Sequence, residues 1–355
     1  MILAGGRGER FWPLSRASKP KQFLKLTSDK SMLQETIDRV NPIIPLDRIR
    51  VVAGESMSQM IVASCADLAE GHILTEPCGR NTCLAIGLGA QHLILDDSDA
   101  VMVVLSSDHL IRPAERMNQI LEDASAIAAE SAHLITIGVV ATRPETGYGY
   151  IKLGDEFQSN RGCAAYEVAA FAEKPKAVVA QEYYYSRRYL WNSGIFVWRA
   201  DSVLEQIRLH QPDMSTLLQE YAKQIGKPGE QKARAKLYDE AASISIDYAI
   251  LEKASNVLTI KADIIWDDVG SWGALERYKE VDSENNVLIG DTLAFDTYET
   301  TVYNDSDGLI ATLGVADLVV VRSKDITLVA HKTKLGKIKE MLAELAKDEK
   351  TKTYL

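Results

Sequence analysis

Residues 1–26 decide the fold, because a short apolar segment runs directly into a loop that is rich in glycine and arginine. The stretch reads Met1-Ile-Leu-Ala-Gly-Gly-Arg-Gly-Glu-Arg-Phe-Trp-Pro-Leu-Ser-Arg-Ala-Ser-Lys-Pro-Lys-Gln-Phe-Leu-Lys-Leu26. The apolar run Met1–Ala4 is typical of a buried strand. The glycines that follow allow a sharp turn whose backbone amides point at phosphate oxygens. Arg7, Arg10 and Lys21 add positive charge, so the stretch predicts a loop that binds a triphosphate.

A glycine cluster alone is weak support, because a plain turn with a solvated basic face accounts for the same residues equally well. Two familiar phosphate-binding patterns are excluded. No Gly-Lys-Ser/Thr follows at the spacing of a P-loop, and the dinucleotide-binding pattern would need a further glycine at Phe11. The rest of the chain has to decide between the two interpretations.

Length, composition and charge limit the class of protein. The chain has 355 residues, of which 46% are hydrophobic and 25% charged, enough for one large domain with a small appendage or for two domains. No apolar run is long enough to span a bilayer, and the first residues form a predicted strand rather than a signal segment, so we expect a cytoplasmic protein without a membrane partner. A net charge of −10 argues against nucleic acid as a partner. The four cysteines have neither metal-ligand nor disulfide spacing.

Strand-like and helix-like segments alternate over residues 1–284. Predicted strands follow Met1–Ala4 at 49–53, 72–75, 101–105, 134–140, 195–198 and 257–260, and predicted helices include 31–40, 55–69, 81–95 and 114–131. This alternation predicts an α/β fold with a Rossmann-like, mostly parallel open sheet and helices on both faces. Ligands of such sheets lie beyond the carboxyl ends of the strands. Residues 285–355 instead predict a small β-rich appendage that ends in a helix near 334–347.

Six motifs in this order resemble those of the sugar-1-phosphate nucleotidylyltransferases, and most of all the mannose-1-phosphate guanylyltransferases. They are the opening signature Leu3-Ala-Gly-Gly-Arg-Gly-Glu-Arg10 with Trp12-Pro-Leu-Ser-Arg16 and Pro20-Lys-Gln-Phe-Leu24, then Glu76-Pro-Cys-Gly-Arg-Asn-Thr82, Asp108-His109, Glu173-Lys-Pro175, Trp191-Asn-Ser-Gly194 and Trp266-Asp-Asp-Val-Gly-Ser-Trp272. The resemblance implies that 1–284 is a nucleotidyltransferase catalytic domain and that 285–355 resembles a short β-helix.

The resemblance also implies a reaction, in which GMP passes from GTP to α-D-mannose 1-phosphate to give GDP-mannose and pyrophosphate. The implied partners are these two substrates. The C-terminal segment either packs on the catalytic domain or joins two copies of the chain in a homodimer. Two alternatives stay open. The chain could serve another sugar or base, such as glucose 1-phosphate, or it could be a non-catalytic subunit that senses GDP-mannose.

Site residues follow from the motifs, residue by residue. The resemblance implies catalytic roles for Arg10, Lys21, Asp108 and Asp268, with Asp108 and Asp268 as ligands of Mg²⁺ or another divalent cation. It implies nucleotide binding by Leu3, Ala4, Gly5, Gly6, Gly8, Arg10, Lys21, Glu76, Arg80, Asn81 and Asp108. It implies binding of the sugar phosphate by Gly149, Glu173, Lys174 and Asn192.

The chemistry of these residues agrees with the implied roles, although each has an alternative. Glu76 is able to accept the N–H donors of guanine, while the polar residues after it could simply cap the next helix. Asp108 follows an apolar strand and suits Mg²⁺, which takes few carboxylates plus phosphate oxygens. Asn192 lies among large apolar residues and needs hydrogen-bond partners, which a sugar would supply. Asp247 either supports this site or caps a helix.

Overall fold

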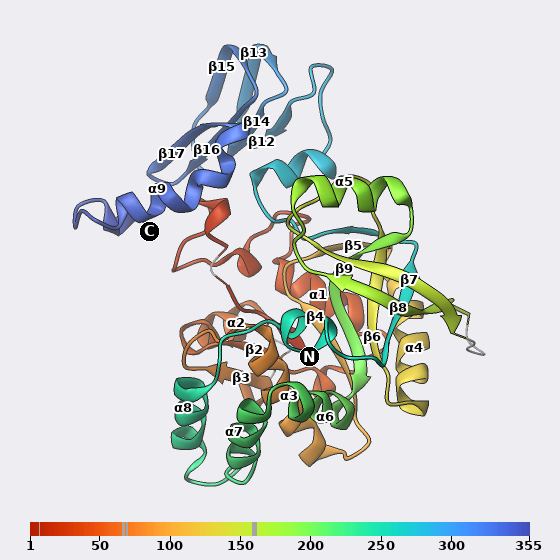
Figure 1. Ribbon diagram of the computed structural model, residues 1–355. Helices are drawn as coiled ribbons and strands as arrows, with labels where there is room; N and C mark the ends of the chain where they lie inside the picture. Colours follow the sequence, from red (N-terminus) through yellow and green to blue (C-terminus); the bar gives the residue numbers. More distant parts are fainter. Residues whose placement is uncertain (7, 66–67, 69, 158–161) are drawn as a thin grey trace. The chain divides into compact units, whose positions relative to one another are not determined.

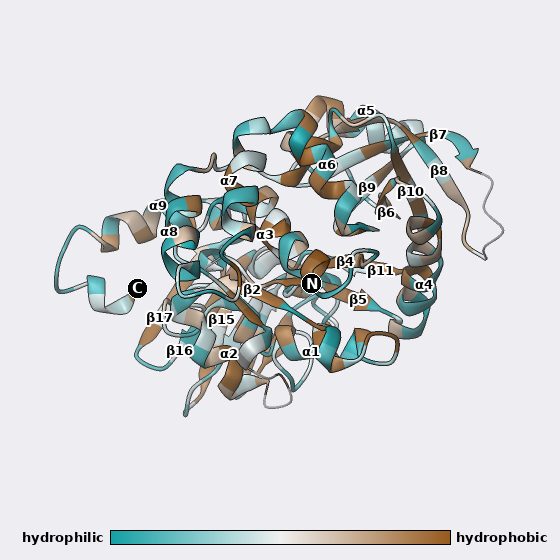
Figure 2. Cartoon of the chain, turned by 90° about the horizontal axis from the view of Figure 1, so that it is seen from below, coloured by the Kyte–Doolittle hydropathy of each residue, from teal (hydrophilic) through white to brown (hydrophobic). Residues whose placement is uncertain are grey.

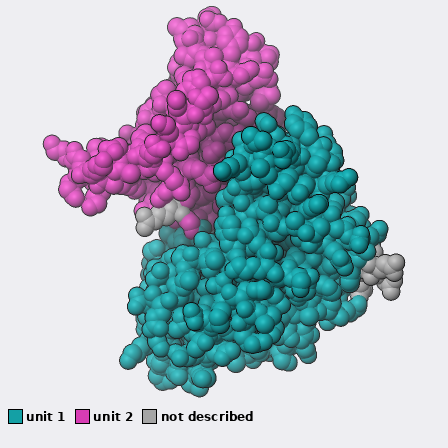
Figure 3. All heavy atoms as spheres, in the orientation of Figure 1, with its two compact units in different colours: residues 1–5, 36–107, 111–266 teal, residues 6–35, 108–110, 267–355 magenta. Residues whose placement is uncertain are grey.

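The computed structural model describes residues 1–6, 8–65, 68, 70–157 and 162–355. These residues form two compact units, which Figure 3 colours separately. Unit 1 comprises Met1–Gly5, Thr36–Ser107 and Ile111–Trp266, and unit 2 comprises Gly6–Glu35, Asp108–Leu110 and Asp267–Leu355. Arg7 and three positions near the end of the predicted helix 55–69 lie outside the described residues.

The strands and helices follow each other as Figure 1 labels them. The strands of the large sheet are β1 (Ile2–Leu3), β2 (Val51–Gly54), β3 (Ile73–Glu76), β4 (Val101–Ser106), β6 (Leu134–Val140), β7 (Gly149–Phe157), β8 (Ala165–Ala172), β9 (Tyr189–Arg199) and β10 (Val257–Ala262). The helices are α1 (Met32–Val40), α2 (Ser58–Ser64), α3 (Asn81–Asp96), α4 (Ala114–Glu130), α5 (Ala177–Ser186), α6 (Ala200–His210), α7 (Pro212–Ala222), α8 (Glu230–Glu240) and α9 (Ile338–Leu345). The short strands β5 (Leu110–Arg112) and β11 (Ile265–Asp267) pair with each other.

Unit 1 is built on a nine-stranded sheet in the order β3-β2-β1-β4-β9-β6-β10-β8-β7. Strands β3, β2, β1 and β4 are parallel, and β6 is parallel to β10. Strand β9 runs antiparallel to both β4 and β6, and β7 and β8 form an antiparallel pair. The predicted Rossmann-like α/β core is confirmed. Its second half contains more antiparallel pairing than the sequence alternation suggested, because only residues 158–164 connect β7 to β8, fewer than a parallel crossover needs.

Apolar residues on both sides of this sheet form the core of unit 1. Met102 and Val104 of β4 belong to one apolar cluster together with residues of α3, α6, α7 and α8. Helix α4 packs against β4, β6, β9 and β10, and its own buried residues lie outside that cluster. In Figure 2 hydrophobic colour follows the buried strands, whereas helices such as α4 carry both kinds of residue. The arrangement holds the carboxyl ends of the parallel strands in fixed positions.

Unit 2 contains the predicted β-rich segment together with the N-terminal loop. Strands β12 (Val287–Ile289), β14 (Thr301–Asn304), β16 (Leu318–Ser323) and β17 (Ile326–His331) form one sheet, and β13 (Thr292–Tyr298) pairs in parallel with β15 (Ile310–Ala316). Phe11 and Trp272 pack with their rings 5.2 Å apart in an apolar cluster that also contains Tyr303. The terminal helix α9 is shorter than predicted, because a 3-10 helix, Lys332–Lys337, replaces its first turns. The predicted β-rich appendage ending in a helix is thus confirmed.

Among the described residues, every helix falls short of the length and apolar character that crossing a membrane requires.

Candidate active site

Three of the four predicted catalytic residues lie together in unit 2, where Asp108 and Asp268 both contact the side chain of Lys21. Lys21 opens a 3-10 turn, Lys21–Phe23, and its side chain is only 7% exposed. Its Nζ donates hydrogen bonds to Asp108 Oδ2 at 2.7 Å and to the backbone oxygen of Asp268 at 2.8 Å. Residues from three distant parts of the sequence therefore converge on one ammonium group.

Lys21 sets the charge of its carboxylate partner. Burial raises the pKa of Asp108, but the positive charge of Lys21, assisted by His109 and by the hydrogen bond from Lys21, outweighs burial and holds the pKa below its ordinary value. Asp108 is therefore ionised at neutral pH. The buried ammonium supplies positive charge of the kind that binds phosphate groups, and the ionised carboxylate beside it suits a divalent cation.

The two neighbouring aspartates of the last motif have different environments. Asp267 is buried and accepts hydrogen bonds from Arg277 Nη2 at 2.6 Å and from the Val269 amide at 2.7 Å. Asp267 is thus engaged in holding the loop together. The backbone oxygen of Asp268 contacts the same ammonium group as the Asp108 carboxylate, so Asp268 is the candidate metal ligand that lies at Lys21.

The donor set of Asp108 and Asp268 fits a hard divalent cation, because Mg²⁺ prefers one or two carboxylates and completes its shell with water and phosphate oxygens. Within the described part of the chain there is no group of three or more His, Cys, Asp or Glu side chains that could enclose a metal by itself. A cation held by these two residues would take its further ligands from water and phosphate oxygens.

The glycine loop lies directly against Lys21. Gly8 has a φ of 64°, and a Cβ placed on it would lie 2.2 Å from Lys21 Cβ, so only glycine fits there. Gly6 also adopts a left-handed conformation, with a φ of 89°. Arg10, the fourth predicted catalytic residue, is exposed on the 3-10 turn that follows. Leu3, Ala4 and Gly5 belong to unit 1, where β1 ends.

The residues predicted to bind the base lie in unit 1, where β3 ends. Glu76 is 7% exposed and accepts a hydrogen bond of 3.0 Å from the Tyr238 hydroxyl. Burial raises the pKa of Glu76, and the Tyr238 bond opposes that rise. Arg80 donates to the backbone oxygens of Tyr238 at 2.6 Å and Asp239 at 3.1 Å, so its guanidinium is committed to the end of α8.

Asn81 and Thr82, rather than Arg80, supply the polar side chains that bond at the start of α3. The residue before α3 is Arg80, and its side chain makes no capping hydrogen bond. Asn81 opens the helix with a φ of 67°, a conformation that asparagine tolerates, and its Oδ1 accepts from the Thr82 amide at 3.0 Å. The Thr82 hydroxyl accepts from the Ile246 amide at 2.9 Å, which ties this loop to the segment carrying Asp247.

The four residues predicted to bind the sugar phosphate also come together in unit 1. Gly149 on β7 pairs in register with Asn192 on β9. A Cβ on Gly149 would lie 2.4 Å from Glu173 Oε2, so the glycine leaves room for this carboxylate beside β7. Glu173 pairs through Oε1 with Lys174, and its Oε2 is buried without a hydrogen-bond partner among the described residues. A buried, unpartnered acceptor suits a ligand hydroxyl.

Asp247 extends this sugar cluster and was not among the predicted site residues. Asn192 donates from Nδ2 to Asp247 Oδ1 at 2.9 Å, and its Oδ1 accepts from the Thr136 hydroxyl at 2.9 Å. Asp247 begins a π-helical turn, Asp247–Leu251, a feature that is frequent at functional sites. Burial, followed by the negative charge of Glu173, raises the pKa of Asp247 to about 6. The sequence signal was the polar run Ser245-Ile-Asp-Tyr248, which also fits a helix cap.

We expect Asp247→Asn to stabilise the protein at neutral and higher pH. The folded-state pKa of Asp247 exceeds its unfolded value of 3.8, so the group favours folding when protonated and loses that contribution as pH rises through about 6. The substitution should therefore raise the free energy of unfolding by about 2 kcal/mol at about pH 8 and leave it unchanged at about pH 4. Urea unfolding at both pH values measures the difference.

The matched control is Asp155→Asn, which changes an exposed aspartate on β7. An equal gain in the free energy of unfolding at both pH values, or the same gain in the control, would contradict a raised pKa of the Asp247 carboxyl group in the folded protein. Glu173 and Lys174 stay unchanged in both variants.

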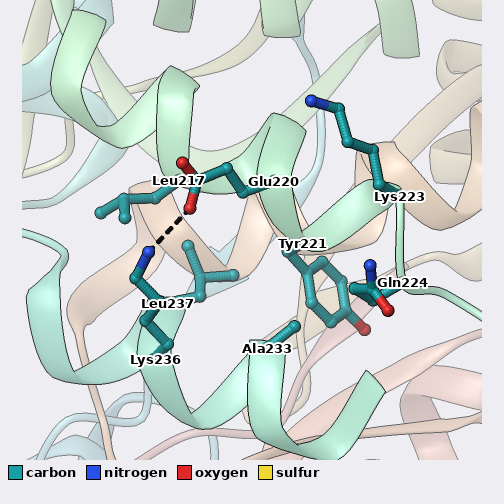
Figure 4. Close-up of a pocket in the computed structure, with 8 residues that line it drawn as sticks. All are labelled: Leu217, Glu220, Tyr221, Lys223, Gln224, Ala233, Lys236 and Leu237. Carbon is teal, nitrogen blue, oxygen red and sulfur yellow. Dashed lines mark hydrogen bonds and ion pairs between the residues drawn. The ribbon is translucent and has the colours of Figure 1, made fainter. Parts of the chain in front are cut away.

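A separate surface pocket of about 300 Å³ lies between α7 and α8 (Figure 4). Lys236 and Glu220 face each other across it and form an ion pair of 2.8 Å. The predicted substrate residues come from other elements, so this pocket is not the site that the motifs indicate.

Comparison with known proteins agrees with this fold. Residues 1–285 match the model of the nucleotidyl transferase family, and residues 290–345 match that of the MannoseP isomerase/GMP-like beta-helix domain. The chain therefore belongs to the nucleotidyl transferase family. Enzymes of this family generally use a divalent metal.

Several curated relatives are named mannose-1-phosphate guanylyltransferase. The chain is 37% identical to the one from Escherichia coli K12, with 98% of this chain and 73% of the relative covered, and 38% identical to ManC of Salmonella typhimurium LT2 over the same shares. A crystal structure from Thermus thermophilus, described as a mannose-1-phosphate geranyltransferase, superimposes with a TM-score of 0.86 at 34% identity, covering 97% of this chain and 98% of that one. The resemblance of the motifs to those of the mannose-1-phosphate guanylyltransferases is thus confirmed over nearly the whole chain.

Proposed function

We propose that this chain transfers GMP from GTP to α-D-mannose 1-phosphate and releases pyrophosphate and GDP-mannose. The observation that carries the proposal is the convergence of Asp108 and Asp268 on the buried Lys21 ammonium beside the glycine loop. Family membership and the names of the relatives support the same reaction. A sensing subunit would have no need to keep this charged cluster.

The proposed chemistry is a direct in-line displacement. A phosphate oxygen of mannose 1-phosphate attacks the α-phosphorus of GTP, a new P–O bond forms, and the bond to the β-phosphate breaks with pyrophosphate as the leaving group. No general base is required, because the attacking phosphate is ionised at neutral pH. Catalysis then consists of positioning and charge stabilisation.

Unit 2 supplies the charge stabilisation in this proposal. The backbone amides around Gly6 and Gly8, with Arg10, bind the β- and γ-phosphates and stabilise the leaving pyrophosphate. Lys21 bridges the α-phosphate and the attacking phosphate, which relieves the repulsion between two anions. Asp108 and Asp268 would hold Mg²⁺, which supplies Lewis-acid neutralisation of phosphate charge when bound.

Unit 1 supplies recognition. Glu76 accepts hydrogen bonds from guanine, and the amide groups near Asn81 and the nearby Leu3 and Ala4 backbone support the nucleotide. Glu173 Oε2 and the Asn192 amide contact the mannose hydroxyls, and Lys174 contacts the sugar phosphate. Lys174 suits that role because, although burial lowers its pKa, the Glu173 carboxylate outweighs burial and raises it. We assign Arg80 the task of shaping the base site, in view of its bonds to α8.

The chain is divided into two domains in this proposal. We propose a catalytic domain of residues 1–284 and a C-terminal appendage of residues 285–355. The appendage carries apolar side chains at the surface of unit 2, including Phe295 and Leu313, which are 67% and 72% exposed and lie opposite each other on β13 and β15. A homodimer would cover such residues. We also propose a cytoplasmic location for the protein.

The proposal is tested by incubating the protein with GTP, mannose 1-phosphate and Mg²⁺ and identifying the product by mass spectrometry. We expect GDP-mannose. A parallel reaction with glucose 1-phosphate tests the choice of sugar. Faster formation of GDP-glucose than of GDP-mannose would move the assignment to another member of the family. GDP-mannose binding without product formation would favour the sensing subunit.

A further inference from the structure

The C-terminal end of helix α8 is hydrogen-bonded to the loop that carries the predicted base-binding residues. The Tyr238 hydroxyl donates to Glu76, and Arg80 donates to the backbone oxygens of Tyr238 and Asp239. Arg234, one turn earlier, donates to the Thr75 hydroxyl at 2.9 Å and to the Thr75 backbone oxygen at 3.3 Å. These bonds run in both directions between α8 and the end of β3 with the loop that follows it, and all of their residues belong to unit 1.

The bond between Tyr238 and Glu76 is buried. Tyr238 is 1% exposed, and its hydroxyl reaches Glu76 Oε1 inside the protein. A carboxylate in such surroundings adopts the orientation that its donor dictates, because leaving it unpaired is costly. It accepts about four hydrogen bonds when ionised, so the single bond from Tyr238 leaves capacity for a ligand.

We propose that Tyr238 is a positioning residue for nucleobase recognition, which holds Glu76 as the acceptor for the two N–H donors on the pairing edge of guanine. Arg234 and Arg80 complete the clamp by holding the backbone on either side of Glu76. The inference deepens the proposed function and rests on it for the role of Glu76.

The chemistry of the bases explains why this position sets selectivity. Guanine presents N1–H and the 2-amino group side by side, and a carboxylate is able to accept from both. Hypoxanthine keeps N1–H and lacks the amino group, while adenine has an acceptor at N1 that a carboxylate repels. A site built to accept hydrogen bonds rejects analogues that lack the donors. The preference for GTP over ITP therefore reports on the orientation of Glu76.

The experiment measures the affinity of the full chain for GTP and for ITP by titration calorimetry, in the wild type and in Tyr238→Phe. We expect the variant to bind GTP about tenfold more weakly, the size expected for losing a hydrogen bond to a charged group. ITP affinity should fall less, so the GTP-to-ITP affinity ratio should shrink. Affinity for mannose 1-phosphate should be unchanged.

The matched control is Tyr221→Phe on α7. Tyr221 is also 1% exposed, and its hydroxyl donates to a carboxylate, that of Glu230, at 3.1 Å. This variant removes the same atom from a partly buried bond to a carboxylate and should leave the GTP-to-ITP ratio at the wild-type value. Glu230 also lies 3.7 Å from Arg234, so an unchanged ratio shows that loss of a tyrosine bond near α8 is not enough to alter selectivity. A ratio that changes equally in both variants would overturn the inference.

An unchanged ratio in folded Tyr238→Phe protein would also overturn it. Should that variant prove unstable, Arg234→Gln, which removes the bonds to Thr75, should lower the ratio in the same direction, and an unchanged ratio there counts against the inference. Because binding selectivity does not require turnover, a wild type that binds GTP without forming GDP-mannose would contradict the proposed function and leave this measurement decisive.

Discussion

Replacing Lys21 with alanine is expected to reduce turnover by about 10³-fold, because the variant loses the ammonium group that offsets repulsion between the two reacting phosphates. Lys21 is buried, and its Nζ is held by Asp108 Oδ2 and the Asp268 backbone oxygen. The charge is therefore fixed in place before substrates bind. Pyrophosphate release at saturating GTP and mannose 1-phosphate measures the loss as a fall in kcat.

The control for this variant is Lys25→Ala, which removes an exposed lysine from the same segment. It should keep nearly wild-type turnover. Removal of Lys21 leaves the Asp108 carboxylate without this partner, which is expected to destabilise the protein. Circular dichroism is therefore used to check that the Lys21 variant is folded. Near-normal kcat in folded Lys21→Ala protein would contradict the proposed bridging role.

Replacing Asp268 with asparagine is expected to reduce turnover by about 10²-fold or more and to raise the Mg²⁺ concentration needed for half-maximal rate. The substitution removes one of the two carboxylates that would hold the metal, while the backbone oxygen that contacts Lys21 stays in place. Turnover measured across a Mg²⁺ series separates weaker metal binding from a general loss of activity.

Asp267→Asn provides the contrast, because Asp267 is bonded to Arg277 and to the Val269 amide. Breaking that ion pair, whose arginine is 34% exposed, should lower the free energy of unfolding by about 2 kcal/mol. Its Mg²⁺ dependence should match that of the wild type. If the Asp267 variant shifts the Mg²⁺ dependence and the Asp268 variant does not, the metal-ligand assignment is reversed.

Much of the fold could be predicted from the alternation of apolar and helical segments. The parallel strands β1 to β4 and their helices appear where the pattern placed them, because each strand is buried on both faces and reads as a continuous apolar run. The antiparallel insertion of β9 between β4 and β6 was not predictable in the same way. Strand direction depends on the connections, and the segment from β7 to β9 lacks a regular crossover pattern.

The candidate site was predictable where a side chain's chemistry alone suggests its role. Asp108 and Asp268 follow apolar segments and both lie at Lys21. The hydrogen bonds from Arg80 to the end of α8 were not predictable, because their acceptors are backbone oxygens that every residue carries. Asp247 was only partly predictable, since its bond to Asn192 joins residues that are 55 positions apart.

The central claim is metal-assisted transfer of GMP to a sugar phosphate, and pyrophosphate release tests it most directly. The protein would be incubated with mannose 1-phosphate and Mg²⁺, with GTP, ATP, UTP or dTTP in parallel reactions. We expect release with GTP that exceeds release with the other nucleotides and that stops when a chelator is added. Absence of release with every nucleotide, from folded protein that still binds GDP-mannose, would contradict the proposed enzyme and favour a sensing subunit.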